Sequence, residues 1–125
     1  MSNISKITKF TDLNAWQEAH KLVVAIYKIT KGFPKEELFG LVSQMRRSAV
    51  SITSNLAEGF GRQGQADKKQ FYIVARGSVT ELQNQMLICH DVGIISAKSF
   101  SGLSDQSVIV HKLIVGLIKS MERGK

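Results

Sequence analysis

The chain has 125 residues, of which 43% are hydrophobic and 22% are charged, a composition usual for one globular domain. Its 17 lysines and arginines outnumber its 10 acidic residues, and the excess is spread over both halves of the chain, which excludes a basic tail. The formal charge of +7 favours a folded surface that meets nucleic acid through phosphate contacts, with a basic protein that is merely soluble as an equal alternative.

The single cysteine, Cys89, excludes an internal disulfide and fits a reducing compartment. The N-terminal sequence MSNISKITKF has no apolar run typical of a signal peptide. The most apolar stretch, residues 108–118, contains His111 and Lys112 and is too short to cross a bilayer. We therefore expect a cytoplasmic protein with no membrane partner.

Apolar residues at helical spacing predict a first helix over about residues 12–31, capped by Asp12 and stopped by Gly32 and Pro34. A second helix is expected over about residues 36–59, because Pro34 and the two glutamates that follow suit a helix N-terminus. Its predicted core-facing stripe consists of Leu38, Leu41, Val42, Met45, Ala49, Ile52 and Leu56.

A third helix is expected over about residues 67–92, where Asp67 and Gln70 resemble a capping box and Gly93 is placed to end it. A fourth is expected over about residues 97–122, although its opening contains weak helix formers, which leaves a late or irregular start open. No segment alternates as a strand does. Short connections favour antiparallel neighbours, so we predict one all-α domain over residues 1–125, an up-down-up-down four-helix bundle.

The glycine-rich stretch from Gly59 to Gly64 matches the G-x-G-x-x-G pattern, but a helix precedes it where a dinucleotide site needs a strand. It is better explained as the end of the second helix, with Arg62 just before a helix N-terminus that could hold a phosphate. The histidines lie on different segments, and no serine has a suitably spaced base. We therefore expect no enzymatic activity, no metal and no cofactor, and we interpret Cys89 as a small buried hydrophobe.

The side of the second helix opposite its apolar stripe is small and polar rather than rich in Lys and Glu. Such a surface suits helix packing, either between subunits or within the bundle. Charged side chains at a partly buried contact need partners, so a polar network of Asn55, Glu58 and Glu81 with Arg46 and Arg47 is an alternative use of the arginines. The residues predicted to pack helices or subunits are Gln44, Arg46, Ser48, Ser51, Asn55, Glu58, Gly77, Ser78 and Glu81.

An ordered series of residues between positions 10 and 95 resembles a known family. It includes Trp16-Gln17, Phe33-Pro34, Phe39-Gly40-Leu41, Gln44, Arg46-Arg47, Ser48-Ala49-Val50-Ser51-Ile52, Asn55-Leu56-Ala57-Glu58-Gly59, Gly61-Arg62, Ala75-Arg76-Gly77-Ser78 and Glu81-Leu82. The chain resembles the four-helix-bundle proteins encoded in intervening sequences of bacterial 23S ribosomal RNA genes, whose relatives include accessory variability proteins of diversity-generating retroelements.

The resemblance implies an antiparallel bundle that assembles as a ring-like homopentamer. The retroelement relatives have a basic surface that is associated with nucleic acid and a reverse transcriptase. The intervening-sequence branch, which this chain resembles more closely, has no settled biochemical activity. No catalytic residues therefore carry over to this chain.

Charge and resemblance together predict a non-enzymatic, homo-oligomeric basic bundle that binds structured RNA or other nucleic acid. The candidate contacts are Arg47, Arg62, Lys68, Lys69 and Arg76. The alternative is a scaffold that docks a reverse transcriptase or a ribosome-associated protein, which exposed apolar residues around Ile73 and Ile88 would favour.

Overall fold

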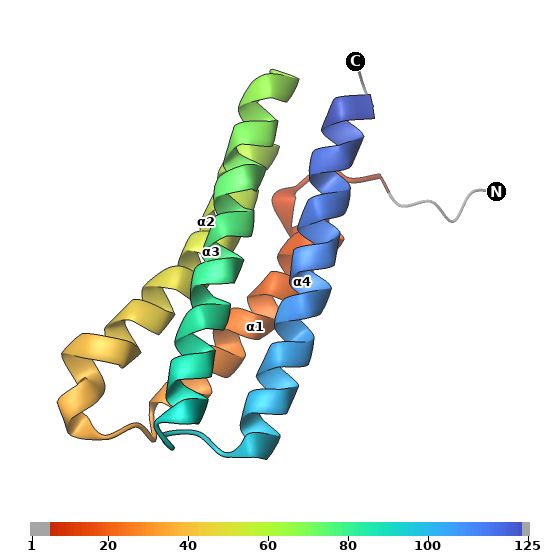
Figure 1. Ribbon diagram of the computed structural model, residues 1–125. Coiled ribbons are helices and arrows are strands. Elements are labelled where there is room, and N and C mark those ends of the chain that lie inside the picture. The colour runs from red at the N-terminus through yellow and green to blue at the C-terminus, as the bar shows by residue number, and fades with distance from the viewer. Residues whose placement is uncertain (1–5, 124–125) are drawn as a thin grey trace.

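The computed structural model describes residues 6–123 of the chain, and four long helices lie side by side in it (Figure 1). They are α1 (Asn14–Thr30), α2 (Ser43–Phe60), α3 (Gln65–Asp91) and α4 (Ala97–Arg123). Successive helices run in opposite directions, and α1 packs against both α2 and α4, while α3 packs against the same two helices from the other side. No strand occurs in residues 6–123, so the predicted all-α, up-down-up-down bundle is confirmed.

The chain enters α1 differently from the prediction. Asp12 does not cap α1; its Oδ2 accepts hydrogen bonds from the backbone N–H groups of Thr8 and Lys9, each at 3.0 Å, and so closes the short 3-10 turn Phe10–Asp12. These bonds favour the ionised carboxylate and lower the pKa of Asp12. Leu13 takes the capping position of α1 and makes no side-chain cap.

The chain before α2 is not the continuous α-helix that was predicted from residue 36. A 3-10 turn, Lys35–Glu37, leads into a π-helical turn, Leu38–Val42, and regular α2 begins only at Ser43. Gly40 departs from helical angles (φ −109°, ψ −107°), and this kink turns Leu38 away from the core, where it is half exposed. The prediction of Leu38 as a core residue was therefore wrong.

The starts of α3 and α4 also correct two expectations. Helix α3 begins at Gln65 after Gly64, two residues before Asp67, and no side-chain bond caps it, so the proposed capping box does not form. Helix α4 begins at Ala97 without an irregular start, because the Ser96 hydroxyl accepts a bond from the Ser99 N–H at 3.1 Å. Between them Gly93 ends α3 as expected, with a positive φ of 81°.

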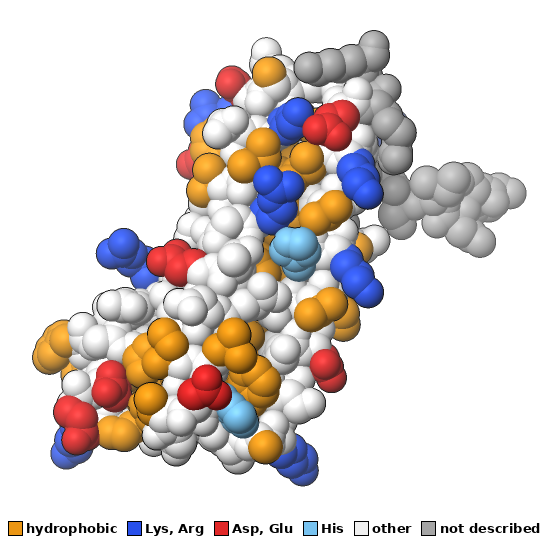
Figure 2. Space-filling model, viewed as in Figure 1, with side chains coloured by type: hydrophobic (Ala, Val, Ile, Leu, Met, Phe, Trp, Pro, Cys, Tyr) orange, Lys and Arg blue, Asp and Glu red, His pale blue; other side chains and the backbone are white. Residues whose placement is uncertain are grey.

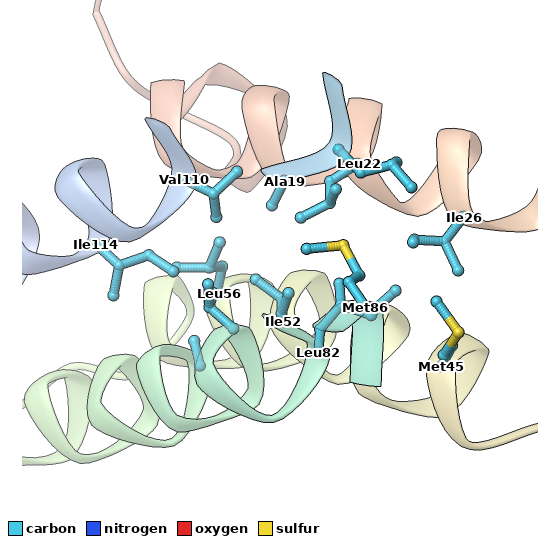
Figure 3. Packing of buried hydrophobic residues seen from close by; sticks show 14 of the residues in the cluster. Ala19, Leu22, Ile26, Met45, Ile52, Leu56, Leu82, Met86, Val110 and Ile114 are labelled. Atoms are coloured by element: carbon cyan, nitrogen blue, oxygen red, sulfur yellow. The ribbon is translucent and has the colours of Figure 1, made fainter. Parts of the chain in front are cut away.

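A continuous apolar core fills the space between the four helices (Figure 3). Ile26 of α1 lies opposite Met45 of α2, Leu56 of α2 lies near Val110 and Ile114 of α4, and α3 contributes Leu82 and Met86 to the same core. The largest fully buried side chains are Leu22, Ile26, Met45, Ile52, Leu56, Leu82, Met86, Val110 and Ile114. Within residues 6–123 no helix is long and apolar enough to cross a membrane.

Candidate nucleic-acid interface

The turn between α2 and α3 is held by a close helix contact at Gly59. A Cβ atom at this position would lie 2.8 Å from a ring carbon of Tyr72 and 2.9 Å from the Cβ of Phe71. Only glycine allows α2 and α3 to approach this closely. The glycine-rich stretch thus allows the tight turn between α2 and α3. Arg62 and Lys68 lie at this end of the bundle.

Replacing Gly59 with alanine is expected to destabilise the fold by about 1–3 kcal/mol, because the added methyl group overpacks this contact. Gly77→Ala is the matched control: nothing lies within 4 Å of a Cβ there, so the better helix propensity of alanine should add up to about 1 kcal/mol. Urea unfolding of both variants measures the difference. Equal midpoints for the two variants would show that Gly59 is not tightly packed.

Arg62 is engaged within the chain. Its guanidinium donates from Nη2 to Oε2 of Glu58 at 3.2 Å and lies 4.6 Å from the centre of the Phe71 ring. Both partners of the ion pair are largely exposed, so water screens it and a phosphate could compete for the arginine. Arg62 therefore contributes positive charge near the turn but is not a free anion ligand.

Lys68 and Lys69 also have intramolecular partners. The ammonium of Lys68 donates to the carbonyl oxygens of Phe60 at 2.6 Å and Gly59 at 3.4 Å, where it caps the C-terminal, negative end of α2. Lys69 forms an ion pair with Glu122 at 3.0 Å, which joins the start of α3 to the end of α4. The structure thus uses both predicted RNA contacts to secure helix ends.

Arg76 has a different environment from the cations at the turn. It is half-buried on the side of α3 that adjoins α4, and no acceptor in residues 6–123 binds its guanidinium. Three contacts fix the antiparallel register of the two helices: Lys69 with Glu122, Gln83 with Ser107, and His90 with Phe100. This register puts Arg76 at the level of His111 and Val115, near the middle of the shared surface.

The sequence analysis did not identify the remaining members of this surface. Lys112 and Lys119 are exposed on α4 and lie seven residues apart, which places them on one side of the helix. Figure 2 shows Lys and Arg side chains and one histidine gathered over the upper half of α3 and α4. We call this surface the basic face and define it as Lys69, Arg76, His111, Lys112 and Lys119. The seven-residue spacing was visible in the sequence, but α4 was interpreted only through its apolar stripe.

The two adjacent arginines of α2 point in different directions. Arg46 packs on α1: it donates to the Thr30 hydroxyl at 2.9 Å and to the Tyr27 carbonyl at 3.4 Å, and its guanidinium lies 4.6 Å from the Tyr27 ring centre. Arg47 is exposed on α2, one turn from Ser51, and so lies near the middle of the bundle rather than on the basic face. The proposed network of Arg46 and Arg47 with Asn55, Glu58 and Glu81 does not form: Asn55 bonds Ser51, and Glu58 pairs with Arg62.

The small polar residues of α2 lie partly inside the bundle. The hydroxyls of Ser51 and Ser78 hydrogen-bond at 2.8 Å and link α2 to α3, and the Asn55 amide donates to the Ser51 carbonyl at 2.8 Å. Ser48 is buried at the same seam. The other predicted packing residues, Gln44, Glu58, Gly77 and Glu81, are exposed and thus remain open to a second copy of the chain.

Cys89 is a buried thiol beside Met45, with the two sulfur atoms 3.4 Å apart. Burial, and secondarily the charge of Glu37, raises its pKa, which disfavours the reactive thiolate. The histidines lie on three helices, α1, α3 and α4, with His20 stacked on Trp16. In the part of the chain that the structure describes, no group of three or more His, Cys, Asp or Glu residues is arranged to hold a metal ion.

Comparison with known proteins identifies the family and the fold. Residues 11–116 match the family described as 23S rRNA-intervening sequence protein. The structure is similar to a crystal structure of a protein of unknown function from the S23 ribosomal protein family of Bacteroides thetaiotaomicron, with a TM-score of 0.78 and 22% identity, over 84% of this chain and 95% of that one. No curated protein shows significant similarity to the chain.

Proposed function

The chain belongs to the 23S rRNA-intervening sequence protein family, and we propose that it is a non-enzymatic bundle that binds structured RNA or other nucleic acid through its basic face. The observation that carries this proposal is that Arg76, between α3 and α4, has no acceptor among the residues that the structure describes. A guanidinium offers several N–H donors that match a phosphate, and a half-buried one has less water to give up than a fully exposed one.

The other charges of the basic face support the same use. Lys112 and Lys119 lie on the solvent-facing side of α4, with Lys112 bordering a hollow toward the start of α1, and no acceptor in residues 6–123 binds either ammonium group. Three cations along one helix pair suit a run of backbone phosphates, which gives affinity without sequence readout. The shape of a folded RNA would then decide which molecule binds.

Self-association is part of the proposal. We place the chain in the cytoplasm as a homo-oligomer, a pentamer if it assembles as the resemblance implies. A ring would bring several copies of the basic face to one RNA molecule. Linked contacts of this kind raise the overall affinity well above that of a single copy.

Titration of a labelled, structured ribosomal RNA fragment at 50 mM and 200 mM salt tests the proposed binding. Three phosphate contacts predict that affinity falls about 40-fold between these concentrations. A dissociation constant no better than millimolar at the lower salt would contradict the proposal. Binding that does not change with salt would contradict it too, because the phosphate contacts would then be absent.

A second function, docking of a reverse transcriptase or a ribosome-associated protein, is favoured by exposed apolar side chains near the end of α3. Leu87, Ile88 and Val92 are 49%, 41% and 63% exposed. Such residues suit a protein partner better than a phosphate backbone. Two results together would support this function over RNA binding. The wild-type protein would bind the partner but not RNA, and Leu87→Glu would abolish the partner binding.

A further inference from the structure

Phe39 is the most exposed large apolar side chain in residues 6–123, at 91%. It projects from the π-helical turn before α2, next to Leu38, which is 50% exposed. Removing a phenylalanine side chain from water is favourable, so this position is stabilised by contact with a partner surface. Glu36 precedes it and is exposed, which makes the projection both apolar and acidic.

A matching groove lies between α1 and α4 on the same chain. It is shallow and open to solvent, with a volume of about 810 Å³. Ala25, Ile29 and Leu103 supply its apolar lining, Ser99 and Gln106 its polar lining, and no atom lies within 4 Å of a Cβ at Gly102. Lys28 and Lys98 border it, and no acceptor in the described residues binds their ammonium groups. The groove is therefore apolar inside and positively charged at its edge, the complement of the Phe39 projection.

The two surfaces lie at the same end of the bundle but on different sides. The start of α2, the second half of α1 and the first turns of α4 all lie at the lower end in Figure 1. Because the projection and the groove lie at the same height along the bundle axis, a contact between them would place two copies side by side. One copy would be shifted little along that axis relative to the other. A head-to-tail contact without such a shift forms a ring when the rotation from one copy to the next closes.

We infer that Phe39 of one copy inserts into the α1–α4 groove of a second copy, with Glu36 of the first facing Lys28 and Lys98 of the second. This inference rests on the self-association in the proposed function and identifies its surfaces. The basic face lies toward the opposite end of the bundle, so assembly through this contact leaves it exposed. Assembly and RNA binding are therefore separable by mutation.

Light scattering of two variants and their mixture tests the contact. Phe39→Glu removes the projection, and Gly102→Trp fills the groove without meeting any atom within 4 Å of its Cβ. Each variant alone is expected to be monomeric. An equimolar mixture is expected to form a dimer, because one intact projection then meets one intact groove. Val74→Glu, at an exposed apolar position on α3 outside both surfaces, should keep the wild-type mass.

Charge exchange provides an independent check of the pairing. Glu36→Lys and Lys98→Glu should each lower the mass, and the double variant should restore it. A wild-type oligomer whose mass is unchanged in Phe39→Glu would overturn this contact but not self-association. A monomeric wild type at micromolar concentration would overturn both, and would leave RNA binding by the basic face to the titration. Circular dichroism confirms that each variant keeps its helices.

Discussion

Replacing Arg76, Lys112 and Lys119 together by glutamine is expected to weaken binding of structured RNA about a hundredfold at 0.15 M salt. Each phosphate contact that is lost no longer releases condensed counterions, which is worth about fivefold in affinity per contact at this salt concentration. The slope of log affinity against log salt should fall by about three for the same reason. Fluorescence anisotropy over a range of salt concentrations measures both quantities.

The matched control removes the same number of charges from exposed positions outside the basic face. Lys31→Gln, Lys35→Gln and Arg47→Gln together leave the same net charge but keep the basic face, so RNA affinity should fall by less than about threefold. Arg47 was itself predicted to contact nucleic acid, and this control tests that prediction. Equal losses in the two triple variants would mean that net charge alone governs binding.

Leu56→Ala is expected to destabilise the bundle by about 2–5 kcal/mol, the largest effect of any single change proposed for stability. Leu56 is fully buried and contacts the core from α2 (Figure 3), so its truncation loses apolar burial and leaves a cavity that the surrounding helices fill only in part. Urea unfolding followed by circular dichroism gives the free energy directly.

Leu87→Ala is the control for the core variant, since Leu87 is 49% exposed on α3. The same truncation at this surface position should change the unfolding free energy by no more than about 0.5 kcal/mol. Comparable losses for the two variants would show that Leu56 does not pack as the structure describes. RNA affinity of folded Leu56→Ala should stay at the wild-type value, because the basic face is not altered.

The core of this fold was predictable because its signal repeats along each helix. Met45, Ala49, Ile52 and Leu56 recur at helical spacing, and all four are buried. The exceptions lie at the border between the apolar and the polar side of a helix. Val74 is apolar and close to the buried side of α3, but it is 44% exposed. Helical period fixes the direction of a side chain, but the position of the neighbouring helix decides whether that side is covered.

The local starts of helices were less predictable, because more than one donor set competes for the same side chain. Asp12 is a good cap by residue type, yet it bonds Thr8 and Lys9 instead of α1. At the kink around Gly40, the Glu37 carboxylate likewise accepts a hydrogen bond from the Leu41 N–H at 3.4 Å. Which backbone N–H group a side chain bonds depends on the local geometry of the turn. Residue type alone does not specify that geometry.

Partners of long cationic side chains could not be predicted from their positions. Arg62 and Lys68 look like free cations in the sequence, but a turn brings Glu58 and the end of α2 within their reach. Arg76 looks the same in sequence, but in the described part of the chain no acceptor binds its guanidinium. Only the packing of α3 against α4 distinguishes it.

The most direct test of the basic face is a lysine acetylation footprint of the protein with and without a structured ribosomal RNA fragment, read by mass spectrometry. The account predicts that RNA lowers the acetylation of Lys112 and Lys119 several-fold and leaves Lys31 and Lys35, at the other end of the bundle, unchanged. Uniform protection of all four lysines, or protection only of Lys31 and Lys35, would contradict it.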